Sequence, residues 1–483
     1  MIELSLAEIA GLTGGQPSPG ADRATVRVTG PVVIDSRKAA PGSLFAAIAG
    51  ERADGHDFAA AAAERGAVAV LGTRPVDGLP TVVVPDVLAA LARLARATVN
   101  RLSAPGEAGR PGLVVAGITG SSGKTSTKDL TAQLVERLGE TVSPQESLNN
   151  ELGVPLTVLR ADERTRYLVL EMAARGPGHI AALCEIAPPR IGAVLNVGRA
   201  HAGEFGSLET VAKAKGELVE ALPASGVAIL NADDPRVLAM ADRTEARVVT
   251  FSTAGPGGPA AAPETIADVR AAQITLDDLG RPSFQLVMPG GEAPVALALH
   301  GGHNVANALA AAAIAAELGM DVPAIADALS QATTRSAKRM EVHERHDGVL
   351  IVNDAYNANP DSMRAGIEAL GHMIARGRRG IAVLGHMAEL GDIDVVSHAE
   401  AGRLAAQVGM AVIVAVGEAA RPVLDGARAQ AGWDGQAIDV PDPAAAVTVL
   451  GNLLRPNDVV LVKASKAAGL WEVADGLLTE VDR

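Results

Sequence analysis

The feature that most constrains this chain is a glycine-rich segment between an apolar run and an amphipathic run. In VVAGITGSSGKTSTKDL, a predicted buried strand from Leu113 to Ile118 leads through glycines to Lys124 and Thr125, after which helical periodicity begins. Glycines let backbone amides surround phosphate oxygens, and the helix N-terminus adds positive charge. Lys124 would neutralise phosphate and the Thr125 hydroxyl would reach a magnesium ion. The segment predicts a site for a nucleoside triphosphate, and a glycine-rich turn with an incidental lysine is the alternative.

The spacing of this loop differs from the standard form GxxxxGK. Gly117 and Gly123 enclose five residues, whereas Gly120 and Gly123 enclose two. The order of strand, glycines, Lys-Thr and helix is nevertheless complete. The expected nucleotide-binding residues of the loop are Gly120, Ser121, Ser122, Gly123, Lys124 and Thr125.

Predicted strands and helices alternate along most of the chain. From Leu113 onward, β-branched runs such as YLVLEM, IGAVLNV and GVAIL each precede a stretch of helical periodicity, which predicts a parallel sheet covered by helices. Between Ser252 and Leu299 a shift to Gly, Pro and Ala predicts a loop and an antiparallel excursion. A second series begins near Arg335 with GVLIVNDAY, IAVLGHMAEL, MAVIVAVGEAA and NDVVLVKASK, and predicts a doubly wound unit.

The first hundred residues predict a smaller α/β unit, which ends in the Pro/Gly-rich segment SAPGEAGRPG. The length of 483 residues agrees with about three domains of roughly 150 residues each. We therefore expect an α/β protein of three domains.

Composition and charge exclude several classes of function. The chain has 42 basic and 56 acidic residues, and its formal charge of −14 repels a nucleic-acid backbone. Cys184 is the single cysteine, so no internal disulfide forms, as is typical of a reducing compartment. No basic leader precedes an apolar run, and no stretch approaches about 18 apolar residues. We expect a cytoplasmic monomer without membrane insertion or a nucleic-acid partner.

Two further polar residues follow predicted strands. Glu171 ends the run YLVLEM, at the sheet edge where parallel sheets bind ligands, so its carboxylate is a candidate to hold magnesium. A carboxylate that caps a loop is the alternative. His201 follows the next strand in NVGRAHAGEFG, and by itself a loop histidine is more often a hydrogen-bonding residue than a metal ligand.

The ordered set of motifs resembles the Mur ligase family, whose members add amino acids or a dipeptide to the uridine-nucleotide precursor of peptidoglycan. The resemblance rests on TGSSGKTSTKD, SLNNELGVPLTVL, LVLEMAARGPGHI, AVLNVGRAHAGEFGSLETVAKAKGEL, GGHNVANALAA, RMEVHERHDGVLIVNDAYNANPDSMRA and VLGHMAELG. It implies an N-terminal uridine-nucleotide domain over residues 1–107, a central P-loop ATPase-type domain over 108–332 and a C-terminal Rossmann-like ligase domain over 333–483.

The segment NDAYNANPDSM resembles the corresponding segment in the branch of the family that adds D-alanyl-D-alanine to UDP-N-acetylmuramoyl-tripeptide. The resemblance implies ATP and Mg²⁺ as cofactors. The γ-phosphate of ATP would convert the terminal carboxylate of the peptide into an acyl phosphate, which the dipeptide amine then attacks. Magnesium ions would neutralise the repulsion between that carboxylate and the triphosphate.

The resemblance also implies a metal and catalytic set. His201 corresponds to the histidine of a second magnesium ion, and Lys215 to a lysine that several members carbamylate, although the nearby Lys213 leaves the register open. A solvated helical lysine is the alternative for Lys215. The implied catalytic residues are Lys124, Glu171, His201 and Lys215, and the implied metal ligands are Thr125, Glu171, His201 and carbamylated Lys215.

Further nucleotide contacts are implied at three positions. Asn304 in GGHNVAN corresponds to an asparagine that contacts adenine, and an ordinary helix N-cap is the alternative. Arg339 and Asp354 correspond to residues that reach the ATP phosphates and ribose, and surface ion pairs are the alternative. Because they belong to the third domain, they would give ATP a role in domain closure.

The other substrate is implied to contact two segments. Ser36 and Arg37 in DSRKAAPGS correspond to the uridine-nucleotide segment, with an exposed turn arginine as the alternative. Asn149 and Asn150 correspond to a loop that meets the muramoyl substrate.

Three positions depart from the family pattern: His386 stands where an acidic residue is common, and Ala464 and Lys466 stand where glycine and arginine are usual. One alternative function is a ligase of the same fold for another amino acid or a folate. Another is a nucleotide-switched binding protein, although Glu171, His201 and Lys215 together exceed what a switch requires. The third residue of the accepted peptide, diaminopimelate or lysine, is left open.

Overall fold

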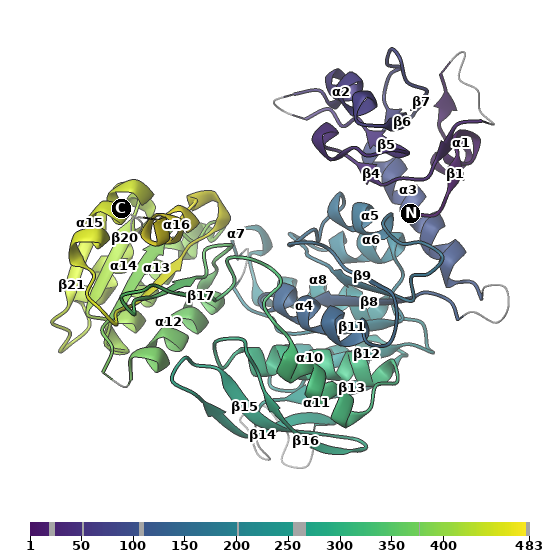
Figure 1. Cartoon of the computed structure of the whole chain (residues 1–483). Helices are drawn as coiled ribbons and strands as arrows, with labels where there is room; N and C mark the ends of the chain where they lie inside the picture. Colours follow the sequence, from purple (N-terminus) through teal and green to yellow (C-terminus); the bar gives the residue numbers. More distant parts are fainter. Residues whose placement is uncertain are drawn as a thin grey trace.

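The computed structural model describes residues 1–18, 25–50, 53–105, 111–199, 202–254, 267–375 and 377–479. Figure 1 shows an N-terminal lobe in purple, a central lobe in blue to green, and a C-terminal lobe in green to yellow. We define these lobes as residues 1–105, 111–331 and 338–479. The α/β class is confirmed, whereas the domain boundaries expected after residues 107 and 332 stay predictions.

The N-terminal lobe is built on a small sheet in the order β2-β7-β6-β5-β4, in which β4 to β7 run parallel and β2 is antiparallel to β7. A separate antiparallel pair joins β1 and β3. The elements are β1 (Leu4–Ser5), α1 (Leu6–Thr13), β2 (Gln16–Pro17), β3 (Arg27–Val28), β4 (Val32–Val33), β5 (Ser43–Ala46), α2 (Ala59–Glu64), β6 (Ala67–Gly72), β7 (Thr81–Val83) and α3 (Val87–Ser103).

The central lobe contains a sheet in the order β16-β15-β14-β13-β12-β11-β8-β10-β9. Strands β9 to β13 and β8 are parallel, and β14 to β16 form the antiparallel excursion expected from the sequence. The first elements are β8 (Val114–Thr119), α4 (Lys124–Val135), β9 (Thr141–Val142), α5 (Gly153–Val158), β10 (Tyr167–Glu171), α6 (His179–Ile186), β11 (Ile191–Val194), α7 (Ala202–Phe205) and α8 (Leu208–Glu220). The remaining elements are β12 (Val227–Asn231), α9 (Pro235–Leu238), β13 (Arg247–Ser252), β14 (Val269–Leu276), β15 (Pro282–Met288), β16 (Gly291–Ala296), α10 (Asn304–Glu317) and α11 (Val322–Gln331).

The C-terminal lobe has its own sheet, in the order β17-β18-β22-β19-β20-β21, with only β17 antiparallel among the described strands. Its elements are β17 (Glu341–Glu344), β18 (Leu350–Asn353), α12 (Pro360–Ile374), β19 (Gly380–Gly385), α13 (Asp394–Gln407), β20 (Val412–Val416), α14 (Pro422–Arg428), β21 (Gln436–Val440), α15 (Pro443–Leu453), β22 (Val459–Lys463) and α16 (Trp471–Thr479). Asp442 and Asn359 cap α15 and α12, each just before a proline, which is a strong helix start.

Apolar packing joins the N-terminal and central lobes. The long helix α3 packs on α5 and α6, and one core cluster includes Leu91 and Leu94 of α3 with Val154 and Leu183 of the central lobe. On the other face of the central sheet, the Ala-rich α10 packs against α4. The phosphate-loop helix is therefore held on a rigid support.

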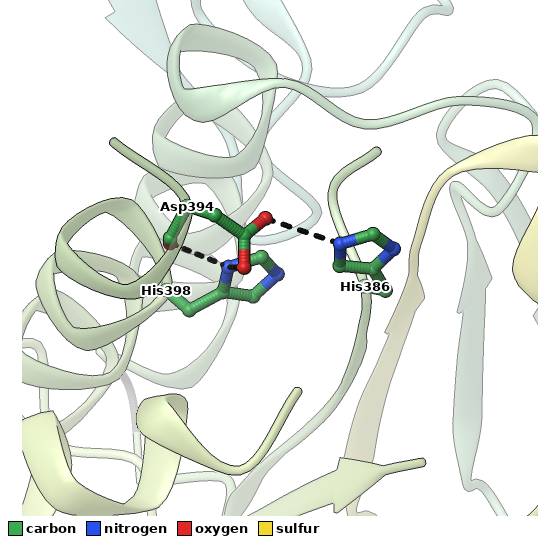
Figure 2. Close-up of side chains that lie close together, drawn as sticks. All are labelled: His386, Asp394 and His398. Carbon is green, nitrogen blue, oxygen red and sulfur yellow. Dashed lines mark hydrogen bonds and ion pairs between the residues drawn. The ribbon is translucent and has the colours of Figure 1, made fainter. Parts of the chain in front are cut away.

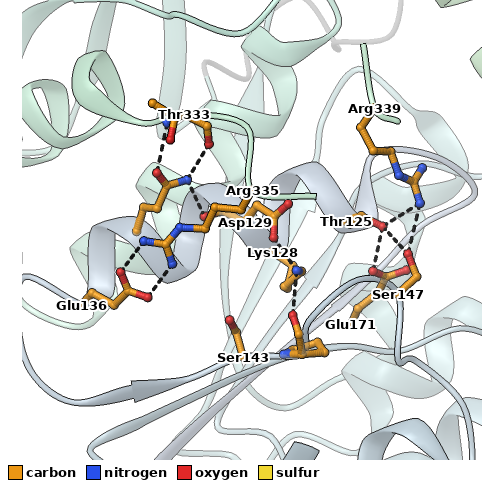
Figure 3. A network of polar contacts seen from close by, with 12 residues as sticks. Thr125, Lys128, Asp129, Glu136, Ser143, Ser147, Glu171, Thr333, Arg335 and Arg339 are labelled. Atoms are coloured by element: carbon orange, nitrogen blue, oxygen red, sulfur yellow. Dashed lines mark hydrogen bonds and ion pairs between the residues drawn. The ribbon is translucent and has the colours of Figure 1, made fainter. Parts of the chain in front are cut away.

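Polar contacts join the central lobe to residues 332–337, the segment that leads into the C-terminal lobe. Thr333 exchanges two hydrogen bonds of 3.0 Å with Gln133 of α4, and Arg335 pairs with Glu136 (Figure 3). Among the described helices, none is both long and apolar enough to cross a bilayer.

Candidate active site

The phosphate loop lies where β8 passes into α4. Gly123 has a φ of 80°, a left-handed conformation that favours glycine, and a Cβ there would collide with the Asn307 side chain. Gly123 also occupies the N-cap of α4 without a side-chain cap, so helix N–H groups stay available for phosphate oxygens. The Lys124 Nζ donates to the Gly120 carbonyl at 2.7 Å and closes the loop. Burial lowers the pKa of Lys124, and Glu171 opposes this effect.

The next residue, Thr125, is the centre of a compact set of oxygen atoms at the carboxyl ends of β8 and β10 (Figure 3). The Thr125 hydroxyl lies 2.9 Å from both the Glu171 Oε2 and the Ser147 Oγ. The other oxygen of Glu171 accepts a hydrogen bond of 2.7 Å from the Asn149 amide. Hydroxyl and carboxylate oxygens are the donors that Mg²⁺ prefers, so the set fits a magnesium ion beside a phosphate.

The C-terminal lobe contributes Arg339 to this set. Its Nη2 donates to the Thr125 hydroxyl at 3.0 Å and to the Ser147 hydroxyl at 3.1 Å, and its guanidinium stacks on Tyr356 at 4.3 Å from the ring centre. A cavity of about 870 Å³ opens here between the two lobes. Its lining includes Lys124, Thr125, Asn149, Asn150, Glu171, Arg175, Arg339, Tyr356 and Lys466.

Lys215 lies on α8 and is 4% exposed, with its pKa well below the usual value because of burial and the nearby Lys124. Among the described residues, none donates to or accepts from its Nζ. Lys213 is exposed, and its carbonyl accepts a hydrogen bond from Arg243. His201, the implied ligand of a second magnesium ion, lies outside the described residues.

A second cavity of about 210 Å³ adjoins the phosphate loop and is lined from both lobes, by Ser122, Asn304 and Asn307 on one side and by Asp354 and Lys463 on the other. Asn304 is the first residue of α10, and the N-cap is His303, so the N-cap alternative for Asn304 is wrong. Its amide donates to the His300 carbonyl at 2.8 Å. Asp354 is not a surface residue, because it is 8% exposed and pairs with the buried Lys463.

The two residues expected in the N-terminal lobe line neither of these cavities. Ser36 is buried in a short 3₁₀ turn, and Arg37 is exposed and bonds to the carboxylate of Asp35, which holds the pKa of Asp35 at about 2. Asn150 lines the larger cavity, and its Oδ1 accepts a hydrogen bond of 2.9 Å from the Gly153 amide at the start of α5.

Of the three departures from the family pattern, His386 belongs to a cluster with Asp394 and His398 at the end of β19 (Figure 2). The His386 Nε2 lies 3.1 Å from the Asp394 carboxylate, and the two rings stack at 5.3 Å. The His398 Nε2 accepts from the Met387 amide and its Nδ1 bonds to the Asp394 carbonyl. Hydrogen bonds therefore account for both nitrogens of His398 without a cation. Ala464 is buried, and Lys466 lies over the Tyr356 ring.

Three residues of the site were not singled out in the sequence. Ser147 contacts Thr125 and Arg339. The Asn196 Oδ1 accepts a hydrogen bond from the Ser122 backbone amide, and the Asn196 Nδ2 donates to the Ser122 carbonyl. Lys463 is 1% exposed at the end of β22. A polar residue at the carboxyl end of an apolar strand was the available signal for Asn196 and Lys463, as it was for Glu171.

Known proteins resemble the chain along its whole length. Family models match in the order of the three lobes: Mur ligase family, catalytic domain over residues 31–102, Mur ligase middle domain over 118–315, and Mur ligase, glutamate ligase domain over 338–466. The UDP-N-acetylmuramoyl-tripeptide–D-alanyl-D-alanine ligase of Mycobacterium tuberculosis is 49% identical, covering 99% of this chain and 98% of the relative. The Escherichia coli enzyme of that name is 36% identical, with 99% of each chain covered.

Solved structures agree with this relationship. MurF from Acinetobacter baumannii superposes with a TM-score of 0.85 at 30% identity and covers 99% of both chains. MurF ligase from Thermotoga maritima, solved in complex with ADP, has a TM-score of 0.78 at 29% identity, with 94% of this chain and 98% of that chain covered. Full-length similarity at this level, with the domain matches in order, establishes that the chain belongs to the Mur ligase family.

Proposed function

We propose that this protein is an ATP-dependent ligase that adds D-alanyl-D-alanine to UDP-N-acetylmuramoyl-tripeptide, in the cytoplasmic synthesis of peptidoglycan precursors for the cell wall. The observation that carries the proposal is the meeting of Thr125, Glu171 and Arg339 in the lining of the cavity between the lobes. The relatives that match the whole chain bear the name of this activity.

The arrangement suits phosphoryl transfer followed by amide formation. The terminal carboxylate of the tripeptide attacks the γ-phosphorus of ATP, the bond to the β-phosphate oxygen breaks, and ADP leaves. The amine of the dipeptide attacks the acyl phosphate, loses a proton, and inorganic phosphate leaves as the amide forms. Lys124 from the central lobe and Arg339 from the C-terminal lobe would both stabilise the negative charge of the phosphates. The reaction therefore requires both lobes to contact ATP.

A magnesium ion would be held by the Thr125 hydroxyl and the Glu171 carboxylate, with Ser147 and Asn149 orienting these groups. When bound, it supplies positive charge that reduces repulsion between carboxylate and triphosphate. A carbamate on Lys215 would convert a buried amine into an anion suited to a second ion.

The N-terminal lobe would hold the uridine nucleotide through Ser36 and Arg37, and Asn149 and Asn150 would meet the muramoyl part. Asn304 and Asp354 would contact adenine and ribose from the two sides of the smaller cavity. We further propose that the protein acts as a monomer.

Mass spectrometry of products decides between this proposal and its alternatives. With ATP, magnesium, D-alanyl-D-alanine and the UDP-muramoyl tripeptide, we expect the mass of the tripeptide plus the dipeptide less one water. Removing the UDP group should greatly reduce turnover, because binding energy from that remote group orients the reacting carboxylate. A product only with folates or other amino acids would favour another ligase of the fold, and ATP hydrolysis independent of acceptor and amine would favour a nucleotide switch.

A further inference from the structure

Lys463 is a buried cation to which neither the sequence motifs nor the proposed function assigns a role. It ends β22 beside β18, and its Nζ pairs with the Asp354 carboxylate. The same Nζ lies 3.5 Å from the Asp354 carbonyl and 3.4 Å from the Asn357 carbonyl. Removing such an ammonium from water is unfavourable unless its partners are well placed. Lys463 therefore holds Asp354, which directly follows the end of β18, in one conformation.

Asp354 in turn holds the segment that carries Arg339. The Asp354 Oδ1 accepts a hydrogen bond of 3.1 Å from the Met340 amide. Met340 has a φ of 50° and Lys338 a φ of 61°, so both neighbours of Arg339 adopt the left-handed conformation that residues with a Cβ rarely adopt. Such backbone persists only where surrounding contacts enforce it.

Two other hydrogen bonds hold the backbone on either side of Arg339 in this conformation. The Lys338 amide donates to the Glu341 carboxylate at 2.9 Å, and the Lys338 carbonyl accepts from the Tyr356 amide at 3.1 Å. The strained segment directs the Arg339 guanidinium onto Tyr356 and to the Thr125 and Ser147 hydroxyls. A continuous series of contacts thus runs from Lys463 to the phosphate loop.

We propose that Lys463 is a positioning residue that, through Asp354 and the Met340 amide, aims Arg339 at the phosphates of the bound nucleoside triphosphate. Without the ammonium, the buried Asp354 carboxylate loses its counter-charge and turns away, which frees the Met340 amide. Arg339 then loses its fixed direction while its charge remains. The proposal rests on the proposed function for the reaction it serves, but not for the binding of ATP.

A double-mutant cycle tests whether Lys463 acts through Arg339. We expect Lys463→Met to lower kcat by about 10-fold to 100-fold, as loss of a residue that orients a reacting group does, with Lys463→Arg restoring part of it. In an Arg339→Met background, Lys463→Met should lower kcat little further, because the residue through which Lys463 acts is already absent. Arg428→Met, which removes an exposed cation of the same lobe, serves as the control. Full additivity of the two losses would overturn the proposal.

Nucleotide binding gives a readout that does not depend on ligation. Calorimetry should show that Lys463→Met weakens binding of a non-hydrolysable ATP analogue much more than binding of ADP, because Arg339 acts at the terminal phosphate. Equal weakening of both ligands would place the effect at ribose and overturn the proposal. If the wild-type chain binds both nucleotides but forms no dipeptide adduct, the proposed function fails and this comparison still decides the role of Lys463.

A second variant covers the case in which Lys463→Met does not fold. A Cβ at Gly366 of α12 would lie 3.1 Å from the Lys463 Cδ and 3.4 Å from the Asp354 Oδ2. Gly366→Ala therefore crowds the pair without changing any charge. We expect the same selective loss of affinity for the ATP analogue, and an unchanged ratio of analogue to ADP affinity would contradict the proposal.

Discussion

Two lysines, the partly buried Lys124 and the buried Lys215, dominate the chemistry at the scale of single residues. Burial lowers the pKa of each, and the proximity of Lys124 lowers the pKa of Lys215 further. Lys124 also has Glu171 nearby, which favours its charged form. The environment thus disfavours the ammonium form more strongly at Lys215 than at Lys124, and the neutral amine is the form that reacts with carbon dioxide.

Replacing Lys124 tests the phosphate loop. Lys124→Ala removes the ammonium that closes the loop on the Gly120 carbonyl, so we expect turnover to fall by about 100-fold or more. The melting temperature should change little, since the side chain is not part of an apolar core. Steady-state kinetics with a thermal scan measure both, and near-normal turnover would contradict the assignment of this loop.

Replacing Lys215 tests the carbamate. We expect Lys215→Ala to be nearly inactive and partly restored by short carboxylic acids, which would occupy the vacated space with an anion. The wild-type enzyme should lose activity in acidic buffer depleted of carbon dioxide, because a carbamate forms from the neutral amine and is lost on protonation.

Lys213→Ala is the matched control, because Lys213 is exposed on the same helix. We expect it to behave like the wild type. If Lys213→Ala were the inactive variant restored by acids, the carbamate would belong to Lys213, and if both variants were active, neither lysine would carry one.

At the scale of elements, α13 is fastened to the end of β19 by His398. The buried imidazole accepts from the Met387 amide and bonds to the Asp394 carbonyl, and it stacks on His386. Burial, with a smaller contribution from His386, lowers the pKa of His398 below its usual value, against the opposing effect of Asp394. The folded protein therefore keeps this ring neutral at a pH where the unfolded chain binds a proton.

The lowered pKa of His398 predicts how the free energy of unfolding depends on pH. As pH falls through the usual histidine pKa of about 6.5, the unfolded state takes up a proton first, so the free energy of unfolding decreases. Above that pH the effect is absent. Urea unfolding at pH 7.5 and 5.5 should show a smaller acid loss in His398→Gln than in the wild type, whereas His346→Gln, at an exposed position, should keep the wild-type loss. An unchanged loss in His398→Gln would contradict this origin.

At the scale of the whole molecule, the C-terminal lobe meets the central lobe at the phosphate loop itself. The side-chain amide of Asn359, at the N-cap of α12, donates to the Ser121 carbonyl at 3.3 Å. The backbone amide of Arg199 donates to the Asp361 carboxylate at 2.9 Å. A Cβ at Gly198 would collide with the Asp361 carboxylate. At position 198 the two lobes are so close that a side chain would displace the Asp361 carboxylate.

A methyl group at that position should hold the lobes apart. We expect Gly198→Ala to fold normally and to lower kcat by about 10-fold or more, because misplaced catalytic groups lose the benefit of orientation. Small-angle scattering should show a larger radius of gyration than the wild type. Gly11→Ala is the control, since a Cβ at Gly11 contacts nothing within 4 Å, and equal kcat values for both variants would exclude the steric block.

Much of the fold could be predicted from the sequence. The runs around Leu113, Tyr167 and Ile191 became β8, β10 and β11, and the excursion after Ser252 became β14 to β16. Hydrophobic periodicity reports such elements because each buries a face defined by local spacing. Short edge elements such as β17 and β21 gave no distinct signal, since half-exposed strands have weak apolar patterns.

The sequence by itself determined the phosphate loop, because its geometry follows from consecutive residues: a strand, glycines that tolerate unusual backbone, and a helix start. Only the tertiary structure decided what faces that loop. Arg339 reaches Thr125 across 214 residues of sequence, Lys463 pairs with Asp354 across 109, and burial distinguishes Lys215 from Lys213. Such contacts depend on how separate sheets pack and on which side of a helix is covered, and local spacing carries no information about distances between lobes.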